Sequence, residues 1–153
     1  MLIDASFNAI TGEILAAAIE VHRTLGPGLL ESIYSQCLQF ELAERKLRYA
    51  AQRRIPILYK RLVLDSSYRV DLIVEDCVVV EVKSMAAILA VHQAQLLTYM
   101  KLTGCPAGLL INFNVARLMD GVKRLVNPRV LRGGGGGGGG GGDGGNGGNG
   151  GNG

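Results

Sequence analysis

The sequence predicts an α/β domain, a mixed central sheet flanked by helices, followed by a Gly-rich C-terminal tail. Three observations predict it. Apolar residues recur at helical spacing in the first part of the chain. Apolar runs of strand length, with one further helical segment among them, occupy most of the remainder up to residue 132. Beyond that point the chain consists almost entirely of glycine and asparagine.

The distribution of glycine divides the chain into two parts. Gly133 to Gly142 is an unbroken run of ten, and seven more follow, so 17 of the 23 glycines lie in residues 133–153. Residues 1–132 are long enough for one hydrophobic core, and 48% of the chain is hydrophobic. We therefore expect one domain at 1–132 and a separate tail at 133–153. The length excludes a two-domain enzyme.

Two helices are predicted at the start of the domain. From Thr11, a residue type that favours helix N-caps, apolar residues recur at helical spacing as far as Leu25, where Gly26-Pro27-Gly28 interrupts the pattern. A second helix is predicted from about Leu30 to Lys46. Its expected buried stripe consists of Leu30, Ile33, Tyr34, Cys37, Leu38 and Leu42.

Strands are predicted after the second helix. Between residues 55 and 64 apolar and polar residues alternate, which indicates a strand pair, and Pro56 restricts its strand to a sheet edge or a strand start. Two nearly continuous apolar runs follow, Tyr68 to Val74 and Cys77 to Val82, separated by Glu75 and Asp76. Such runs indicate a hairpin that is buried on both faces in the middle of a sheet.

A helix and two strands complete the domain. The third helix is predicted from about Ala86 to Leu102, and it is followed by a buried strand at residues 108–113 and a last strand at residues 122–126. Strand, helix and strand in that order favour a right-handed parallel crossover. The expected order is ααβββ(β)αββ, with three or four strands before the third helix.

The charge and the cysteine content limit the classes of function that the protein can have. The formal net charge of +3 and the sequence pI of about 8.9 permit binding to DNA without arguing for it. Cys37, Cys77 and Cys105 lack the spacing of a disulfide framework or a zinc site. No Lys or Arg precedes Arg23, and no apolar run approaches the roughly 18 residues of a membrane span. We expect a cytoplasmic protein with no membrane partner.

Three charged residues interrupt the predicted central strands: Asp71, Glu81 and Lys83. A buried carboxylate is tolerated only when it is paired, hydrogen-bonded or bound to a metal. Glu81 and Lys83 share a face because they are two residues apart on a strand. A three-residue loop centred on Asp76 would place Asp71 opposite Glu81 on that face, whereas a two-residue loop at Glu75 and Asp76 would place it on the other face.

If these three side chains converge, they suit metal-assisted phosphodiester hydrolysis. Two carboxylates a few ångströms apart favour Mg²⁺ or Mn²⁺, and the Lys83 ammonium can orient a water or stabilise a developing phosphorane charge. The alternative is a structural Asp–Lys or Glu–Lys pair inside the sheet, because a D…ExK pattern is short and common. Both interpretations remain open on the residues alone.

Further candidates lie on the predicted helices. Glu31 and Tyr34 are three residues apart at the start of the second helix, where the helix dipole favours an acid. Gln95 and Tyr99, at i and i+4 on the third helix, can hold a phosphate or the water of a metal site. The simpler alternatives are a favourable first-turn acid for Glu31 and surface or capping roles for Gln95 and Tyr99.

Five basic residues can line a nucleic-acid groove, although a solvated edge is the simpler interpretation. They are Arg53, Arg54, Lys60, Arg61 and Arg69.

The motifs, taken in order, resemble those of the GxxExxY proteins of the PD-(D/E)xK nuclease superfamily. The matching segments are residues 17–23, 25–31 with Tyr34, 68–72, 80–83, 92–99 and 109–114. Each segment is weak alone, and together they are specific. They cover most of the globular part of the chain.

The resemblance implies a restriction-endonuclease-like core and an endo- or exodeoxyribonuclease activity that depends on Mg²⁺ or Mn²⁺. It implies Asp71 and Glu81 as metal ligands and also as catalytic residues, Lys83 as the catalytic lysine and Glu31 as the supporting helix acid. Gln95 and Tyr99 resemble the QxxxY element of RecB-type nucleases, where they would bind substrate or support the metal site, and Tyr34 belongs to the GxxExxY motif itself.

The tail predicts a second class of function. Asp143, Asn146, Asn149 and Asn152 are spaced by three, so a helix with three residues per turn, of the polyproline II or polyglycine II kind, would align them in one column. Two glycine faces would then be free for contact with other chains. This pattern predicts a homo-oligomer, fibre or tube, extracellular in that case, with the nuclease-like domain as scaffold. The alternative is a flexible glycine-rich linker.

Overall fold

The computed structural model describes residues 2–127. Two helices, α1 (Leu2–Leu25) and α2 (Glu31–Glu44), precede the strands β1 (Tyr49–Tyr59), β2 (Leu62–Val74) and β3 (Val78–Lys83). Helix α3 (Ala90–Thr103) leads to β4 (Ala107–Asn112), the 3₁₀ helix η1 (Leu118–Gly121) and β5 (Val122–Val126). The assembly residues predicted in the tail, from Asp143 to Asn152, lie outside the described residues.

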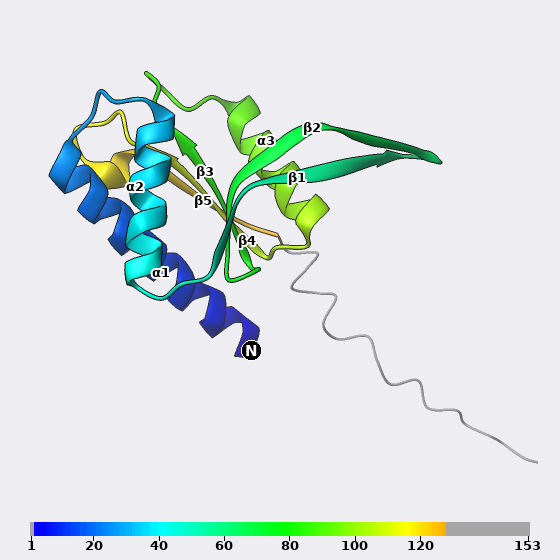
Figure 1. The fold of residues 1–153 in the computed structure, drawn as a ribbon, viewed down its shortest axis with the longest axis horizontal. Coiled ribbons are helices and arrows are strands. Elements are labelled where there is room, and N and C mark those ends of the chain that lie inside the picture. Colours follow the sequence, from blue (N-terminus) through cyan, green and yellow to red (C-terminus); the bar gives the residue numbers. More distant parts are fainter. Residues whose placement is uncertain (1, 128–153) are drawn as a thin grey trace, which may run out of the picture.

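The five strands form one mixed sheet in the order β1-β2-β3-β4-β5. Strands β3 and β4 are parallel and the other three neighbouring pairs are antiparallel. Helices α1 and α2 lie on one side of the sheet and α3 on the other (Figure 1). The predicted α/β fold class, with its restriction-endonuclease-like arrangement of a mixed sheet between helices, is therefore confirmed, as is the parallel β3–α3–β4 crossover.

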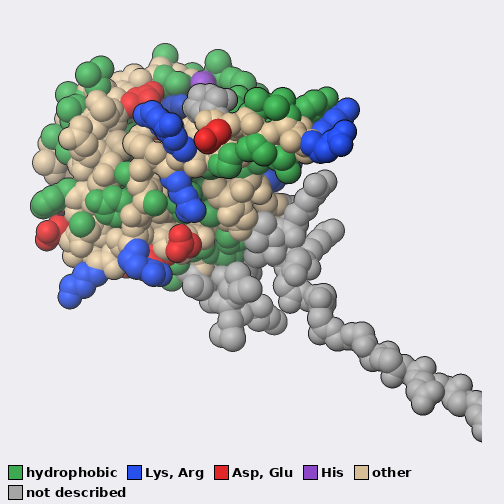
Figure 2. All heavy atoms as spheres, turned by 45° about the vertical axis from the view of Figure 1, so that its right-hand side comes forward, with side chains coloured by type: hydrophobic (Ala, Val, Ile, Leu, Met, Phe, Trp, Pro, Cys, Tyr) green, Lys and Arg blue, Asp and Glu red, His purple; other side chains and the backbone are tan. Residues whose placement is uncertain are grey.

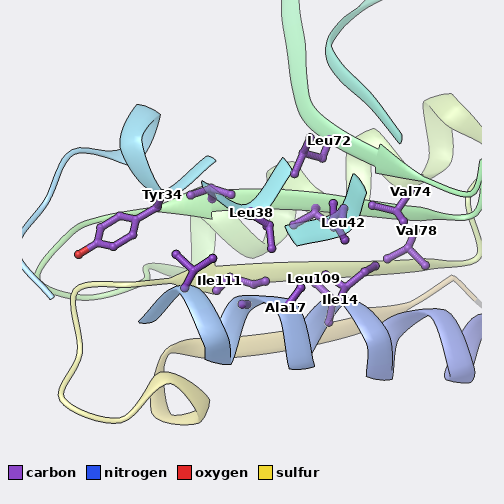
Figure 3. Close-up of a cluster of buried hydrophobic side chains, with 14 of the residues drawn as sticks. Ile14, Ala17, Tyr34, Leu38, Leu42, Leu72, Val74, Val78, Leu109 and Ile111 are labelled. Carbon is purple, nitrogen blue, oxygen red and sulfur yellow. The ribbon is translucent and has the colours of Figure 1, made fainter. Parts of the chain in front are cut away.

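The main hydrophobic core lies between the sheet and helices α1 and α2. It joins the first helices to alternate residues of β2, β3 and β4, and Figure 3 shows this layer. Its labelled members include Ile14, Leu38, Leu42, Leu72 and Leu109. A second core lies under α3, where Leu96 and Met100 pack with Ile73, Val79 and Leu110. The two cores explain why the central strands carry apolar side chains on both faces.

Three predicted helix features differ from the structure. Helix α1 begins at Leu2, not at Thr11. Thr11 does not cap the helix, because its buried hydroxyl donates a hydrogen bond of 2.9 Å to the carbonyl of Asn8 in the preceding turn. The stripe of α2 is rotated: Leu30 is 72% exposed and Ile33 41% exposed, whereas Ser35 is buried. Helix α3 begins at Ala90, four residues later than predicted.

The strands agree more closely with prediction. Strand β5 covers the predicted residues 122–126, and β1, which contains Pro56, lies at an edge of the sheet, where the missing N–H of proline is tolerated. The segments predicted around residues 62–64 and 68–74 are one continuous strand, β2. Three strands therefore precede α3.

Two further features concern the cysteines and the apolar character of the helices. Cys37, Cys77 and Cys105 are free thiols. None of the helices in the described part of the chain is long and apolar enough to cross a membrane.

Candidate active site

The turn between β2 and β3 brings the two predicted acids together. Val74 pairs with Val78 and Leu72 with Val80, so residues 75–77 form a three-residue loop centred on Asp76. The same register places Asp71 opposite Glu81. Of the two loops that the sequence allowed, the structure has the one that puts both carboxylates at the same point of the sheet.

Asp71 and Glu81 are joined through hydrogen bonds to the backbone. The N–H of Asp71 donates to Glu81 Oε1 at 3.1 Å, and the N–H of Val82 donates to Asp71 Oδ2 at 2.8 Å. The regular pairing of β2 with β3 ends at Leu72 and Val80. The two carboxylates therefore accept backbone hydrogen bonds at the point where the strands separate.

The carboxyl of Glu81 lies in a buried position beside that of the half-buried Asp71. Glu81 is only 5% exposed. Burial, and then the charge of Asp71, raise the pKa of Glu81 to about 8, although the N–H of Asp71 and the cation of Lys83 act in the opposite direction. No ion pair within residues 2–127 involves either acid. A cation bound beside the pair would offset the repulsion.

The donor set fits Mg²⁺ or Mn²⁺ better than a metal with a closed protein cage. Residues 2–127 contain no group of three or more His, Cys, Asp or Glu side chains that could hold a metal ion. Mg²⁺ does not need one, because it is usually held by one or two carboxylates, waters and substrate phosphates. Asp71 and Glu81 each use one oxygen for the backbone bonds described above. The backbone leaves the second oxygen of each for a cation, and Asp71 Oδ1 accepts one long hydrogen bond of 3.5 Å from the side-chain amide of Gln52.

Lys83, half-buried, lies at the end of β3 beside this pair. It is two residues from Glu81, and its positive charge acts on the carboxyl of Glu81. The β3–β4 pairing fixes the backbone here, because the N–H of Phe113 donates to the carbonyl of Lys83 at 2.9 Å. The structure therefore brings together all three charged residues predicted for the site.

Glu31 lines the same cleft as Asp71. This cleft has a volume of about 190 Å³ and is lined by Glu31, Ser32, Ser35, Gln52, Asp71 and Val82. Glu31 is the exposed first residue of α2, and its carboxylate accepts a hydrogen bond from the N–H of Ser84 at 3.4 Å. The helix acid predicted to support the site is thus the first residue of α2, and its carboxylate reaches the backbone just after the end of β3.

Gln52 also lines this cleft, although no pattern in the sequence predicts it. It lies within β1 but has a positive φ of 54°, an uncommon conformation for a residue other than glycine. Its side-chain amide donates to Asp71 Oδ1 at 3.5 Å. An exposed glutamine in a strand carries no signal in the sequence, because its role depends on the opposite strand.

Gln95 and Tyr99 lie on the α3 side of the sheet. The Gln95 amide donates to the Tyr99 hydroxyl at 2.9 Å, and the Tyr99 ring meets Tyr68 edge-on at 6.0 Å. Burial, and then the charge of Glu81, raise the pKa of Tyr99. Both residues line a larger cleft of about 500 Å³. Neither residue lines the cleft of Glu31, and the link of Tyr99 to the acid pair is the charge of Glu81 that acts on it.

Tyr34 lies in the core and not in the cleft. Its ring is fully buried and stacks on Phe113, with the ring centroids 4.5 Å apart. Its hydroxyl donates to the carbonyl of Gly26 at 2.5 Å and accepts from the N–H of Leu29 at 3.1 Å. Tyr34 is therefore shielded from substrate, and it holds the loop that precedes Glu31.

Tyr34→Phe is expected to lower the free energy of unfolding by about 1–2 kcal/mol, because the loop loses both hydrogen bonds to the hydroxyl. Urea unfolding measures the change. Tyr59→Phe, at a residue that is 59% exposed, is the matched control and should have little effect. Equal effects of the two variants would contradict a role for the Tyr34 hydroxyl.

A second loop beside the site is held by Asn112 and Ser84. The side chain of the buried Asn112 accepts from the N–H of Met85 at 3.1 Å and donates to its carbonyl at 2.9 Å. The Ser84 hydroxyl donates to the carbonyl of Leu29 at 2.6 Å. These bonds fix the segment after Lys83 in a non-helical conformation, which explains why α3 begins later than predicted.

The comparison with protein families agrees with this geometry. A model of the PD-(D/E)XK nuclease superfamily matches residues 8–125. The chain belongs to this superfamily. Membership indicates a nuclease-like function, and nucleases of the superfamily typically use divalent metal ions. Neither a curated protein nor a solved structure matches the chain.

Proposed function

We propose that this PD-(D/E)XK protein is a metal-dependent nuclease that hydrolyses DNA phosphodiesters. The observation that carries the proposal is the pairing of Asp71 with Glu81 beside Lys83, at the point where β2 and β3 separate. Two adjacent carboxyl groups that form no ion pair within the described residues are costly in a sheet. A catalytic role of Asp71 and Glu81 would explain why the sheet contains them despite this cost in stability. The ordered motifs support a place among the GxxExxY proteins.

Asp71 and Glu81 would hold Mg²⁺ or Mn²⁺ through the carboxylate oxygens that the backbone does not use. When bound, such an ion supplies a Lewis acid that neutralises charge on the phosphate and activates a water. Lys83 would orient the attacking water or stabilise the negative charge that develops on phosphate oxygens. Glu31, which lines the same cleft as Asp71, would accept hydrogen bonds from water. Gln95 and Tyr99 would support the site from the α3 side.

The test is cleavage of DNA by the purified full-length protein. Supercoiled plasmid and end-labelled linear duplex, incubated with Mg²⁺ or Mn²⁺ and with EDTA, distinguish nicking from degradation at ends. Metal-dependent cleavage of either DNA is expected, and an RNA of the same sequence tests selectivity. The proposal fails if the protein binds metal, remains folded and cleaves neither DNA.

The tail supports a second candidate function, a self-assembling subunit. The observation that favours it is the spacing of Asp143, Asn146, Asn149 and Asn152 by three residues. Contacts among glycine-rich tails would join copies of the chain into a fibre or tube. The nuclease-like domain would then be the part that is displayed.

Truncation after Arg132 is expected to abolish such assembly and to leave the domain folded. Negative-stain electron microscopy of the full-length protein beside the truncated one makes the comparison, with circular dichroism as the check on folding. Fibres in the full-length sample alone are the expected result. Dispersed particles in both samples would reject assembly through the tail.

A further inference from the structure

The outer part of the β1–β2 hairpin is a two-stranded ribbon with no third strand. Strand β2 pairs with β3 only at residues 72–74, whereas its pairing with β1 continues out to Tyr59 and Leu62. Figure 1 shows this ribbon projecting from the body of the domain. An isolated ribbon is marginally stable in water, so its length points to a role outside the core.

The ribbon is strongly basic. Its outer part, residues 53–70, carries one acid, Asp65, and five exposed cations: Arg53, Arg54, Lys60, Arg61 and Arg69. None of the ion pairs in the described part of the chain involves any of the five. Figure 2 shows Lys and Arg side chains at the projecting end of the molecule. The ribbon therefore presents an uncompensated positive charge.

Two of these cations repel each other. Arg54 lies directly opposite Arg69 in the β1–β2 register. Like charges at such cross-strand positions destabilise a ribbon. An anion held between the two guanidinium groups would turn this repulsion into attraction, and a guanidinium matches phosphate oxygens with two parallel hydrogen bonds.

The arginine pair lies close to the acid pair. Arg69 is two residues from Asp71 along β2, which corresponds to about 7 Å. Arg54 is two residues from Gln52, whose side chain contacts Asp71 and lines the small cleft. Phosphates of a DNA strand follow each other at about 3.4 Å along the helix axis. An anion between the arginines would thus lie within about two nucleotides of a phosphate at Asp71.

We propose that Arg54 and Arg69 bind a backbone phosphate of the nucleic-acid strand that enters the site. The basic end of the ribbon, Lys60 and Arg61, contacts phosphates farther along. This inference rests on the proposed nuclease function for the kind of substrate, and it adds the residues that hold that substrate beside the reacting phosphodiester. Because the contacts are to phosphate, they fix position and carry no base specificity.

The test compares two double variants of the full-length protein by fluorescence anisotropy. Arg54→Gln with Arg69→Gln removes the pair, and Lys101→Gln with Lys123→Gln removes equal charge from exposed positions on α3 and β5. The probe is a fluorescein-labelled 20-base-pair duplex in EDTA, so cleavage does not interfere. We expect about tenfold or more weaker binding for the arginine variant alone, with the salt-dependence slope reduced by about 2.

Arg69→Glu separates binding from folding. This change places opposite charges across the ribbon, so the thermal unfolding midpoint should stay equal or rise while binding to the duplex falls. A lower midpoint together with weaker binding would attribute the loss to damage of the ribbon and overturn the proposal. Equal losses in the two double variants, or unchanged binding in both, would also overturn it.

The proposed phosphate site and the proposed nuclease activity can be rejected independently of each other. Weaker binding in the arginine variant, with no metal-dependent cleavage by the wild type, would keep the phosphate site and reject the nuclease. Cleavage with unchanged KM in the arginine variant would reject the phosphate site and keep the nuclease. A dimer that sedimentation finds in the wild type and not in the arginine variant, with unchanged DNA binding, would assign the ribbon to a second copy and overturn the proposal.

Discussion

Asp71→Asn, Glu81→Gln and Lys83→Met are each expected to lower kcat for DNA cleavage by about 10³-fold or more. Each change removes a charge at the acid pair or beside it and keeps the side chain close to its original size. A loss of 10³-fold corresponds to about 4 kcal/mol of transition-state stabilisation, which is within the range supplied by a metal ion or an oriented cation. Initial rates of cleavage of the labelled duplex measure the effect.

The matched control for these variants is Glu44→Gln, because Glu44 is an exposed acid at the last residue of α2, about 20 Å along the helix from Glu31 at its start. Its activity should equal that of the wild type. Circular dichroism and urea unfolding establish that the three site variants remain folded. If a folded site variant retained more than a tenth of the wild-type rate, the reaction would not depend on that residue as proposed.

The metal-free protein is expected to lose stability as the pH rises from about 5 to about 8. Glu81 titrates near pH 8 in the folded chain against 4.5 for the ordinary carboxyl, because of burial and then the charge of Asp71. In this window the folded state keeps a proton that the unfolded state has released, so the free energy of unfolding falls with pH and levels off above pH 8. The expected total loss is about 3–5 kcal/mol.

Urea unfolding at several pH values in EDTA measures this slope. Glu81→Gln carries no titrating group, so its stability should vary much less with pH, and at pH 8 it should exceed that of the wild type. Mg²⁺ should stabilise the wild type more at pH 8 than at pH 5.5, because the proton competes with the ion for the carboxylate. The same slope in Glu81→Gln as in the wild type would contradict the assignment of the titration to Glu81.

The two predictions have a common physical basis. A site that holds two carboxylates side by side destabilises the empty fold and is stabilised by a cation. Glutamine at position 81 would therefore give a more stable protein without activity. Buried charged residues that are needed for catalysis are expected to lower the stability of the fold, so replacing them raises stability and removes activity.

The conformation of the turn between β2 and β3 could not be predicted from the sequence. Glu75 and Asp76 both have positive φ, 51° and 54°, although neither is the glycine or asparagine that usually marks such a turn. The Glu75 carboxylate accepts hydrogen bonds from the N–H of Arg48, at 2.7 Å, and from its guanidinium. A residue 27 positions away thus contributes to the conformation that brings Asp71 opposite Glu81.

Local chemistry in the chain was sufficient for most of the elements, though not for the starts of α1 and α3, and for the choice of candidate site residues. Helical spacing, apolar runs and charges inside those runs are properties of short segments, and they predicted the α/β class, the last strand and Asp71, Glu81 and Lys83 as candidates. Contacts between distant segments were needed for the rest: the strand register, the burial of Tyr34, the contact of Gln52 with Asp71 and the facing arginines of the ribbon. The residue that a side chain faces across a sheet depends on loop geometry and on packing against other elements. The periodicity of one segment contains no information about either.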